Sequence, residues 1–486
     1  MRQDLSEPSS RSSLADPGAG RWPETQNLRS WLDLLDARGE LGRVETGIDA
    51  DGALATVLRH ADGRRALHFS DVEGSLFPVV GNLVGGRDHL GLAMGCHGES
   101  AAAHFQGAVA SPRPCRLVEA ASAPVLSRQA PADLLDRLPI GRQHERDGCR
   151  YITAALLSVR DPRTGLTNLS INRMQVVDDT EIRVCVLANR LADVIGEAER
   201  RGRPLDVAIV IGVDPLLVLA SQAPADDGLD DLEVASALRA SPLPVVRAPH
   251  VDALVPAEAE ILIEGRFRPD VREDEGPFGE FPLTYAETAP GPVIDVVGAW
   301  HRPSPIFQTI LSAGREHYLV GGVPREAELL RGLQRCRIDV AQVRLTEASA
   351  CRLHAVVSLR HARAGAARNA IIAALGVNPS LKNVIIVDDD VDVFDDEQVG
   401  WAFTTRVQAD RDLMVFPGVR GSGNDPSATG GITAKLGIDA TAPDDRRSAH
   451  ERIRNIAVDE GALAQYLHEA GIGPRTAVRS PSSPDR

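Results

Sequence analysis

The feature that most constrains this chain is a long series of short apolar runs between residues 151 and 311. The runs are separated by turn sequences such as DPRTG and VDDT. They read YITAALLSVR (151–160), NLSINRMQVV (168–177), EIRVCVLA (181–188), LDVAIVIGV (205–213), AEILIEG (259–265), VIDVVGAWH (293–301) and PIFQTIL (305–311). Only one clear helical pattern interrupts them early, near Asp193–Arg201. Many strands with few helices predict a closed or split β-barrel.

Mixed patterns flank this strand-rich segment on both sides. Residues 26–47 predict an amphipathic helix followed by a strand, because leucines and Trp31 recur there at helical spacing. After Ser312 strands and helices alternate, beginning with a helix predicted at Pro324–Cys336, where a proline precedes a leucine stripe. The fold class predicted is therefore α+β, with a central β-barrel between an N-terminal α/β region and a C-terminal α/β domain.

These patterns predict five segments along the 486 residues. We expect a disordered lead-in (1–22), an N-terminal α/β region (23–115), a barrel domain (116–315), a C-terminal α/β domain (316–472) and a disordered tail (473–486).

Charge and composition exclude several classes of function. A net charge of −15 argues against DNA or RNA as a partner, because phosphate binding needs a basic surface. No apolar run is long enough for a membrane span, and the polar N-terminus lacks the apolar core of a signal peptide, so we expect a cytoplasmic protein. The six cysteines form no CxxC pair and are expected to be reduced. Only two lysines occur, Lys382 and Lys435, and both are singled out for that reason.

The candidate active site is the stretch EGPFGEF at residues 275–281. Glu275 and Glu280 stand five residues apart, and the Gly, Pro and Gly between them make a fixed turn that cannot continue a helix. An apolar Phe278 inside the turn could help to keep one acid protonated at neutral pH. The alternative is a surface turn with two solvated glutamates.

A second informative stretch is NLSINRMQ at residues 168–175. Arg173 alternates there with apolar residues and could orient a nearby carboxylate. The sequence alone does not show whether Arg173 reaches Glu275 or Glu280.

Together, NLSINRMQV and EGPFGEF, in this order and about a hundred residues apart, resemble the UbiD family of decarboxylases. The strings DGCRYITAALLSVRDPRTG, VPAEAEILIEG, PIFQTILSAGREHYL, VDDDVDVFDDEQVGWAFTTR and AKLGIDATAP extend the resemblance over residues 25–445. The resemblance implies a flavin-reductase-like split β-barrel that binds prenylated FMN, and a C-terminal domain used for dimerisation.

The resemblance also implies the catalytic residues. It maps a trio onto Arg173, Glu275 and Glu280. In such enzymes the cofactor forms a covalent adduct with the substrate, so the electrons left by carbon dioxide enter the flavin. Glu280 is then expected to donate the proton, while Arg173 and Glu275 orient the substrate carboxylate.

Cofactor and metal residues follow from the same mapping. The expected cofactor contacts are Asn168, Ser170, Ile171, Asn172, Arg173, Cys185, Val186, Leu187, Arg190 and Lys435, with Lys435 near the flavin phosphate. The family's metal ligands, Asn, His and Glu, map onto Asn168, Asn189 and Asp231, with Glu233 as the near alternative. Asn and Asp oxygens suit Mg²⁺ or Mn²⁺, but an Asn where the family has His leaves the third ligand open. A K⁺ ion at the phosphate is also implied.

Substrate and partners are the least constrained expectations. The family acts on aromatic, heteroaromatic, acrylic and dienoic acids, and an apolar Phe281-Pro282-Leu283 wall suits an extended apolar substrate, such as a terminal unsaturated acid trimmed in polyketide or antibiotic biosynthesis. A flavin prenyltransferase would supply the cofactor, and a homodimer or higher homo-oligomer is expected. The alternatives are a non-catalytic flavin-carrier subunit, which has no need of the trio, and a metal-dependent hydrolase built on paired carboxylates.

Overall fold

The computed structural model describes Trp22 and residues 26–187, 190–224, 228–360, 363–443, 448–450, 453, 456 and 458–470. The predicted tail, the predicted metal ligand Asn189 and all of the predicted lead-in except Trp22 lie outside the described residues. Trp22 is buried, and its ring centroid lies 4.9 Å from that of Trp31. The packed part of the chain therefore includes Trp22, which the sequence assigned to the lead-in.

The N-terminal part is a small α/β unit around a four-stranded sheet of order β1-β2-β3-β18. Its first helix begins at Asn27, whose side chain accepts the backbone N–H of Ser30 while the Ser30 hydroxyl accepts that of Asn27. Strand β18 (Phe307–Gln308) pairs in parallel with β3, so the end of the strand-rich segment returns to this unit. The elements up to residue 137 are α1 (Leu28–Ala37), β1 (Leu41–Val44), α2 (Ala53–Ala61), β2 (Ala66–Phe69), β3 (Val79–Gly81), α3 (Arg87–Met94), η1 (Gly98–Ser100), α4 (Ala101–Ala110), β4 (Arg116–Leu117), η2 (Ala120–Ser122), η3 (Pro124–Leu126), β5 (Arg128–Gln129) and α5 (Leu134–Arg137).

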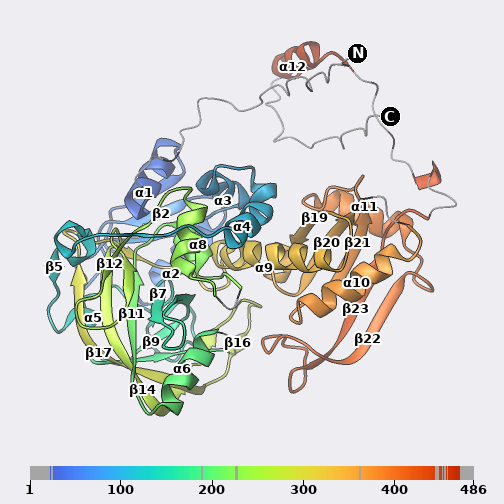
Figure 1. Ribbon diagram of the computed structural model, residues 1–486. Coiled ribbons are helices and arrows are strands. Elements are labelled where there is room, and N and C mark those ends of the chain that lie inside the picture. Colours follow the sequence, from blue (N-terminus) through green and yellow to red (C-terminus); the bar gives the residue numbers. More distant parts are fainter. Residues whose placement is uncertain are drawn as a thin grey trace, which may run out of the picture.

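The strand-rich segment forms a nine-stranded antiparallel sheet that curls into a half-barrel (Figure 1). Its order is β6-β9-β10-β17-β14-β11-β7-β8, with β5 paired to β17. The elements are β6 (Tyr151–Ile152), β7 (Leu156–Arg160), β8 (Thr167–Ile171), β9 (Met174–Val176), β10 (Glu181–Val184), α6 (Arg190–Arg200), β11 (Leu205–Ile211), α7 (Pro215–Ala220), α8 (Asp231–Leu238), β12 (Pro244–Arg247), β13 (Leu254–Pro256), β14 (Ile261–Glu275), β15 (Phe278–Gly279), β16 (Tyr285–Ala286) and β17 (Ala289–His301). Small sheets β13-β12-β4 and β15-β16 accompany it.

Two helices in this segment, α7 and α8, were not predicted. Every residue of α7 is buried, so it has no polar face and no amphipathic pattern to reveal it. Asp214 and Asp230 cap the two helices by accepting backbone N–H groups of their first turns. Helix α8 matters for the site because Asp231 is its first residue.

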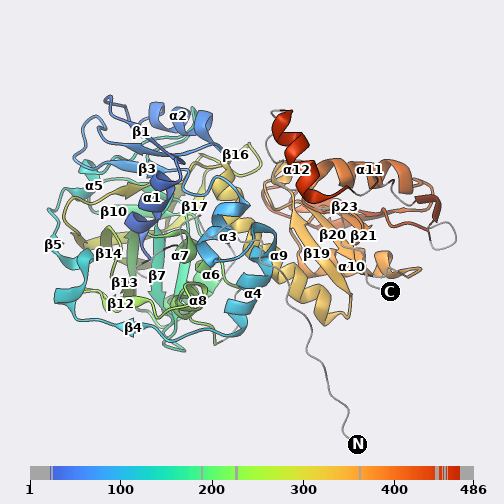
Figure 2. The same cartoon turned by 90° about the horizontal axis from the view of Figure 1, so that it is seen from above.

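The C-terminal part is a five-stranded sheet of order β19-β20-β21-β23-β22. Strands β20, β21 and β23 run parallel, and β19 and β22 are antiparallel edges. Figure 2 shows this sheet with its helices as a second lobe beside the strand-rich half. The elements are α9 (Arg315–Arg335), β19 (Val340–Leu345), η4 (Glu347–Ser349), β20 (His354–Leu359), α10 (Ala366–Val377), β21 (Asn383–Asp388), α11 (Asp396–Arg406), β22 (Leu413–Arg420), β23 (Ile432–Asp439) and α12 (Glu460–Glu469).

Helix α9 corrects the predicted helix start. It begins at Arg315 and carries Pro324 in its interior, rather than beginning at Pro324. Apolar residues Leu319, Val320 and Val323 are buried upstream of the proline, so their packing sustains the helix through it. None of the described helices has the length and apolar character that crossing a bilayer requires.

Candidate functional site

The EGPFGEF turn links β14 to the short β15-β16 hairpin and is fixed from several sides. Gly276 has φ of +102°, a conformation that L side chains rarely adopt. The N–H of Gly276 donates to Gln175 Oε1 (3.1 Å), and that of Gly279 donates to Asp147 Oδ1 (2.9 Å). A side chain at Gly279 would meet His144 Nδ1 at 2.4 Å. The turn therefore has one shape, and this shape sets where Glu275 and Glu280 point.

Arg173 lies between the two glutamates. Its Nε and Nη2 donate to the two carboxylate oxygens of Glu275 at 2.8 and 2.9 Å, and its Nη1 donates to Glu280 Oε1. Burial lowers the pKa of Arg173, but the hydrogen bond to Glu275 and the charges of Glu275, Glu280 and Cys185 together outweigh burial and keep this pKa above its usual value. The ring of Phe278 lies 5.0 Å from the guanidinium carbon. The structure thus brings together the three residues that the sequence could only place on separate stretches.

The two carboxylates differ in their surroundings. The Glu275 side chain is 2% exposed and both its oxygens hold Arg173, whereas that of Glu280 is 17% exposed and lines a cavity of about 250 Å³. Glu275 is therefore placed to orient Arg173, and Glu280 is placed to meet a ligand.

Several predicted cofactor residues line the same cavity. Ile171, Asn172, Cys185 and Leu187 do so, and the Asn172 amide donates to the carbonyl of Cys185 at 2.8 Å. Burial raises the pKa of the Cys185 thiol to about 11. Val186, between them, packs against the core instead.

A second group of predicted residues gathers at β8 and the start of α8. Asp231 Oδ2 accepts from the Asn168 amide (3.2 Å), from the Leu169 N–H (2.7 Å) and from Arg190. Asn168 Oδ1, Asp231 Oδ1 and Ser170 Oγ are buried and have no hydrogen-bond partner. The orphaned oxygens of Asn168 and Asp231, whose side chains contact each other, fit a divalent cation or the polar tail of a cofactor, and Ser170 stands two residues along the same strand. Arg190 already holds one Asp231 oxygen, so the second oxygen is the one left for a cation.

Two other predicted residues lie apart from this group. Among the described residues, no hydrogen bond joins Glu233 to Asn168. The Glu233 side chain is half-buried and, two residues after Asp231 on α8, it lies on another face of the helix. Asp231 is thus the acid beside Asn168. Lys435 is buried in β23, where its ammonium donates to the Pro379 carbonyl (2.7 Å). Its predicted contact with a cofactor phosphate stays a prediction.

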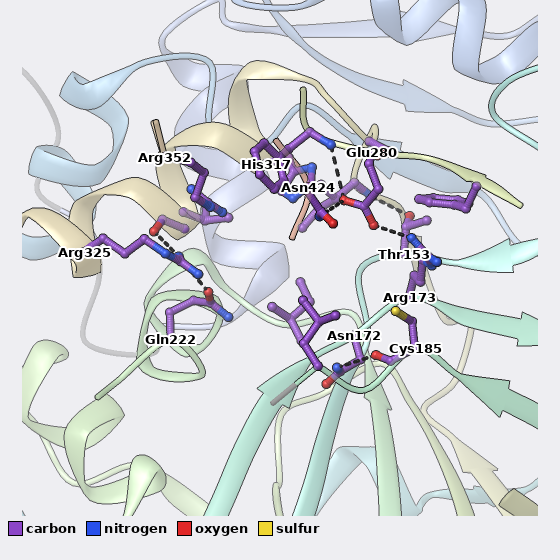
Figure 3. Close-up of a pocket in the computed structure, with 18 residues that line it drawn as sticks. Thr153, Asn172, Arg173, Cys185, Gln222, Glu280, His317, Arg325, Arg352 and Asn424 are labelled. Atoms are coloured by element: carbon purple, nitrogen blue, oxygen red, sulfur yellow. Dashed lines mark hydrogen bonds and ion pairs between the residues drawn. The ribbon is translucent and has the colours of Figure 1, made fainter. Parts of the chain in front are cut away.

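The far end of the cavity is rich in positive charge (Figure 3). Arg325 and Arg352 lie on one side with Gln222, opposite Arg173 and Glu280, and His317 lies between the two ends. Arg325 donates to the carbonyl of Gly321 (2.5 Å) and to Gln222 Oε1 (3.4 Å), and Arg352 donates to the carbonyl of Cys351 (3.2 Å). In the described part of the chain no carboxylate pairs with either guanidinium. Arg352, which is buried, and Arg325, which is half-buried, thus face the cavity without an ion-pair partner within contact distance.

The pKa values at this end reflect uncompensated charge. Burial lowers the pKa of Arg325 more than the charge of Glu328 raises it, and burial together with the charge of Arg325 lowers that of Arg352 well below its usual value. Burial, with these two arginines, lowers the pKa of His317 to about 3. His317 Nδ1 accepts the backbone N–H of Ala313 at 3.2 Å, which leaves Nε2 as the N–H donor of a neutral ring. An anion in the cavity would give the two arginines a negatively charged partner and the His317 N–H a hydrogen-bond acceptor.

No sequence pattern predicted this end of the cavity. His317 and Arg325 are two polar residues on helix α9, and Arg352 lies in a loop after η4. No spacing connects them in the sequence. The only available signal was that His317 falls inside GREHYL, one of the strings that carry the family resemblance.

A glycine on α9 makes room for Arg352. A Cβ at Gly321 would meet Arg352 Nη2 at 2.0 Å, whereas one at Gly376 of α10 would meet nothing within 4 Å. We therefore expect Gly321→Ala to displace the Arg352 guanidinium and to raise KM for an anionic substrate about 10- to 100-fold. Gly376→Ala is the matched control. Equal KM values for the two variants, measured by steady-state kinetics, would contradict this role for Gly321.

His317 also predicts a pH dependence of stability. The pKa of His317 is about 3 in the folded chain and about 6.5 in the unfolded chain. Between pH 3 and pH 6.5 the unfolded chain therefore binds a proton that the folded chain does not. Stability therefore falls as pH drops below about 6.5, by about 2 kcal/mol at pH 5. His317→Asn should reduce the drop in Tm between pH 7 and pH 5, measured by calorimetry. His104→Asn, at an exposed position on α4, is the control, and an unchanged drop in His317→Asn would contradict the prediction.

Comparison with known proteins gives a consistent result over nearly the whole chain. Models of the 3-octaprenyl-4-hydroxybenzoate carboxy-lyase family match residues 32–109 (N-terminal domain), 116–315 (Rift-related domain) and 318–440 (C-terminal domain). An anhydromevalonate phosphate decarboxylase of Methanothermobacter thermautotrophicus is 37% identical over 417 residues, which cover 86% of this chain and 97% of the relative.

Solved structures agree with the sequence comparison. The UbiD-class enzyme HmfF from Pelotomaculum thermopropionicum, in complex with FMN, superposes with a TM-score of 0.88 at 43% identity, over 91% of this chain and all of that one. An evolved dimeric form of HmfF in complex with prenylated FMN gives a TM-score of 0.84 at 42% identity with the same coverage. The mixed α+β fold predicted from the sequence is therefore confirmed.

Proposed function

The chain belongs to the UbiD family of prenylated-FMN-dependent carboxy-lyases, and from this premise we propose that it decarboxylates an unsaturated or aromatic acid that carries a second anionic group. The reaction is non-oxidative and reversible. The observation that carries the proposal is the pair of arginines, half-buried Arg325 and buried Arg352, at the end of the cavity opposite the Arg173–Glu280 pair.

The two ends of the cavity have separate tasks. The carboxylate that leaves as carbon dioxide lies at the end formed by Arg173, whose orientation Glu275 fixes with two hydrogen bonds. The second anion, a carboxylate or a phosphate, lies at Arg325 and Arg352, with the His317 N–H as a third donor. The name anhydromevalonate phosphate decarboxylase describes an acid of this kind for one relative. The charge at this end disfavours the extended apolar substrate of a polyketide pathway, and Leu283, expected in an apolar wall, is 74% exposed.

The chemical step needs one proton. The C–C bond to the carboxylate breaks, carbon dioxide leaves, and a C–H bond forms with the proton of Glu280, which is restored from solvent. When bound, prenylated FMN supplies, through a covalent bond to the substrate, the electron sink that the broken bond requires. A non-catalytic flavin carrier would not need Glu280 in the cavity.

The proposed place of the cofactor rests on the buried oxygens of Asn168 and Asp231 that have no hydrogen-bond partner. The curled sheet is proposed as the split barrel that holds the flavin, with Ile171, Asn172 and Cys185 beside the ring. Asn168 and Asp231 would hold Mn²⁺ or Mg²⁺ at the flavin phosphate, and this cation would neutralise phosphate charge. Asn189 and a K⁺ ion are proposed for the same phosphate site, whereas the contact of Lys435 with the phosphate stays a prediction, because Lys435 lies apart in β23. A flavin prenyltransferase as cofactor supplier, and a homodimer formed through the C-terminal domain, are proposed with it.

The test uses protein co-expressed with a flavin prenyltransferase. Absorbance and mass spectra of the purified protein identify the cofactor, and carbon dioxide release is then measured for matched pairs of acids. Each pair consists of an unsaturated or aromatic acid and the same acid carrying a second carboxylate or a phosphate. We expect turnover for the dianionic members and much weaker turnover for their partners. Equal turnover within each pair, or no release from any acid, would contradict the proposal.

A further inference from the structure

One contact joins the two lobes at the catalytic carboxylate. Glu280 Oε1 accepts from Arg173 in the strand-rich half, and Glu280 Oε2 lies 3.4 Å from the amide nitrogen of Asn424. Asn424 belongs to the loop 421–431 between β22 and β23, and Figure 1 shows this hairpin reaching from the C-terminal sheet toward the other half. Asn424 also lines the cavity, as its position beside Glu280 in Figure 3 shows.

The loop that carries Asn424 is held by charge and hydrogen bonds rather than by an apolar core. Asp425 is its one buried residue, at 5% exposure, while the other loop residues are half-buried or exposed. Four donor groups make five hydrogen bonds to the Asp425 carboxylate: the Lys382 ammonium to both oxygens (2.9 and 3.1 Å), the Ser427 N–H (3.0 Å), the Ser427 hydroxyl (2.8 Å) and the Thr433 hydroxyl (3.2 Å). The position of Asn424 therefore depends on its neighbour Asp425.

The contacts of Lys382 explain why this position holds a lysine, although the chain otherwise uses arginine. Its ammonium reaches both oxygens of Asp425 and the hydroxyl of Ser427, three directions that diverge from one point. A planar guanidinium donates within one plane and suits a single carboxylate edge, whereas an ammonium suits this arrangement. The ion pair is 26% exposed on the lysine side and 3% on the aspartate side.

We propose that Asn424 is a positioning residue for Glu280, and that the Lys382–Asp425 pair holds it there. The Asn424 amide suits both states of an acid that gains and loses a proton, since its NH₂ donates to a carboxylate and, after the amide turns, its oxygen accepts from a carboxylic acid. This inference rests on the proposed function only for the statement that Glu280 delivers the proton. The contact therefore requires the C-terminal lobe to lie against the cavity, as it does in this structure.

The test follows Glu280 itself, by infrared difference spectra of the full-length protein recorded against pH. The carboxyl band that is missing in Glu280→Gln belongs to Glu280, and its midpoint is the pH at which half of it is protonated. Asn424→Ala removes a donor to the charged form, and Asn424→Asp places a second negative charge beside it. We expect the midpoint to rise in both, by about 1 pH unit in Asn424→Asp. Lys382→Met should raise it as well, because the loop loosens.

Kinetics with a turned-over acid give a second readout. Asn424→Ala and Lys382→Met should lower kcat about tenfold with little change in KM, and Asn424→Asp should move the Glu280 limb of the pH–rate profile to higher pH. Arg360→Met is the control, because it breaks an exposed ion pair with Asp339 in the same lobe. An unchanged infrared midpoint in both Asn424 variants would overturn the inference. A wild-type protein without turnover would contradict the proposed function alone, since the infrared midpoint needs no substrate.

Discussion

Replacing Glu280 by glutamine is expected to lower kcat by about 10²- to 10⁴-fold, the usual contribution of a positioned general acid. Glutamine keeps the size of the side chain and an oxygen that can accept from Arg173, but it cannot deliver a proton. The flavin should stay bound, because Glu280 lines the substrate cavity while the proposed phosphate site lies at Asn168 and Asp231. Absorbance of the purified protein checks the flavin, and carbon dioxide release checks the turnover.

The control for Glu280→Gln is the same substitution at a nearby glutamate, Glu287. Glu287 is exposed and follows β16 on the same hairpin, so Glu287→Gln should keep wild-type turnover. Activity above a tenth of wild type in Glu280→Gln, with the flavin bound, would remove Glu280 from the proton-donor role. Loss of flavin in that variant would instead show that Glu280 supports cofactor binding.

The sequence could predict the strand-rich half because it depends on local patterns, whereas the catalytic roles of Arg173, Glu275 and Glu280 came from the family resemblance. Apolar runs with turn residues between them mark β7, β11 and β14 directly, and the fixed spacing of Glu275 and Glu280 is a property of one turn. Arg173 was a candidate from its place on an apolar strand. Its distance to Glu275 could not be predicted, because it depends on the long-range pairing of the sheet.

The features that the sequence did not predict depend on tertiary packing. Helix α7 is buried on all sides, and α9 continues through Pro324 because tertiary packing outweighs the local preference of proline for a helix start. His317 and Arg325 reach the cavity from one face of α9, and Arg352 reaches it because Gly321 leaves space for it. No pattern in one stretch of sequence encodes such a site, because it exists only when α9 packs beside the loop after η4.

Arg352→Met is expected to separate binding from stability. With a dianionic substrate, kcat/KM should fall by about 10²- to 10³-fold, the loss expected when a buried charge pair is broken. With the matched monoanionic acid the change should stay within about threefold, since no partner for Arg352 is present. Arg325→Met should behave in the same way. Steady-state kinetics on the two acids, with each variant, check the prediction.

Stability should move in the opposite direction from binding, because a buried charge without a counter-ion costs free energy in the empty protein. Removing the Arg352 guanidinium should therefore leave Tm unchanged or raise it. Arg406 is the contrast: it is equally buried, but it donates to Asp388 (3.1 Å) and Asp390 (2.6 Å). Arg406→Met removes the guanidinium partner of both carboxylates and should destabilise the protein by about 3–5 kcal/mol. A fall in Tm for Arg352→Met as large as that for Arg406→Met would mean that Arg352 serves the fold, and that the far end of the cavity is not built for an anion.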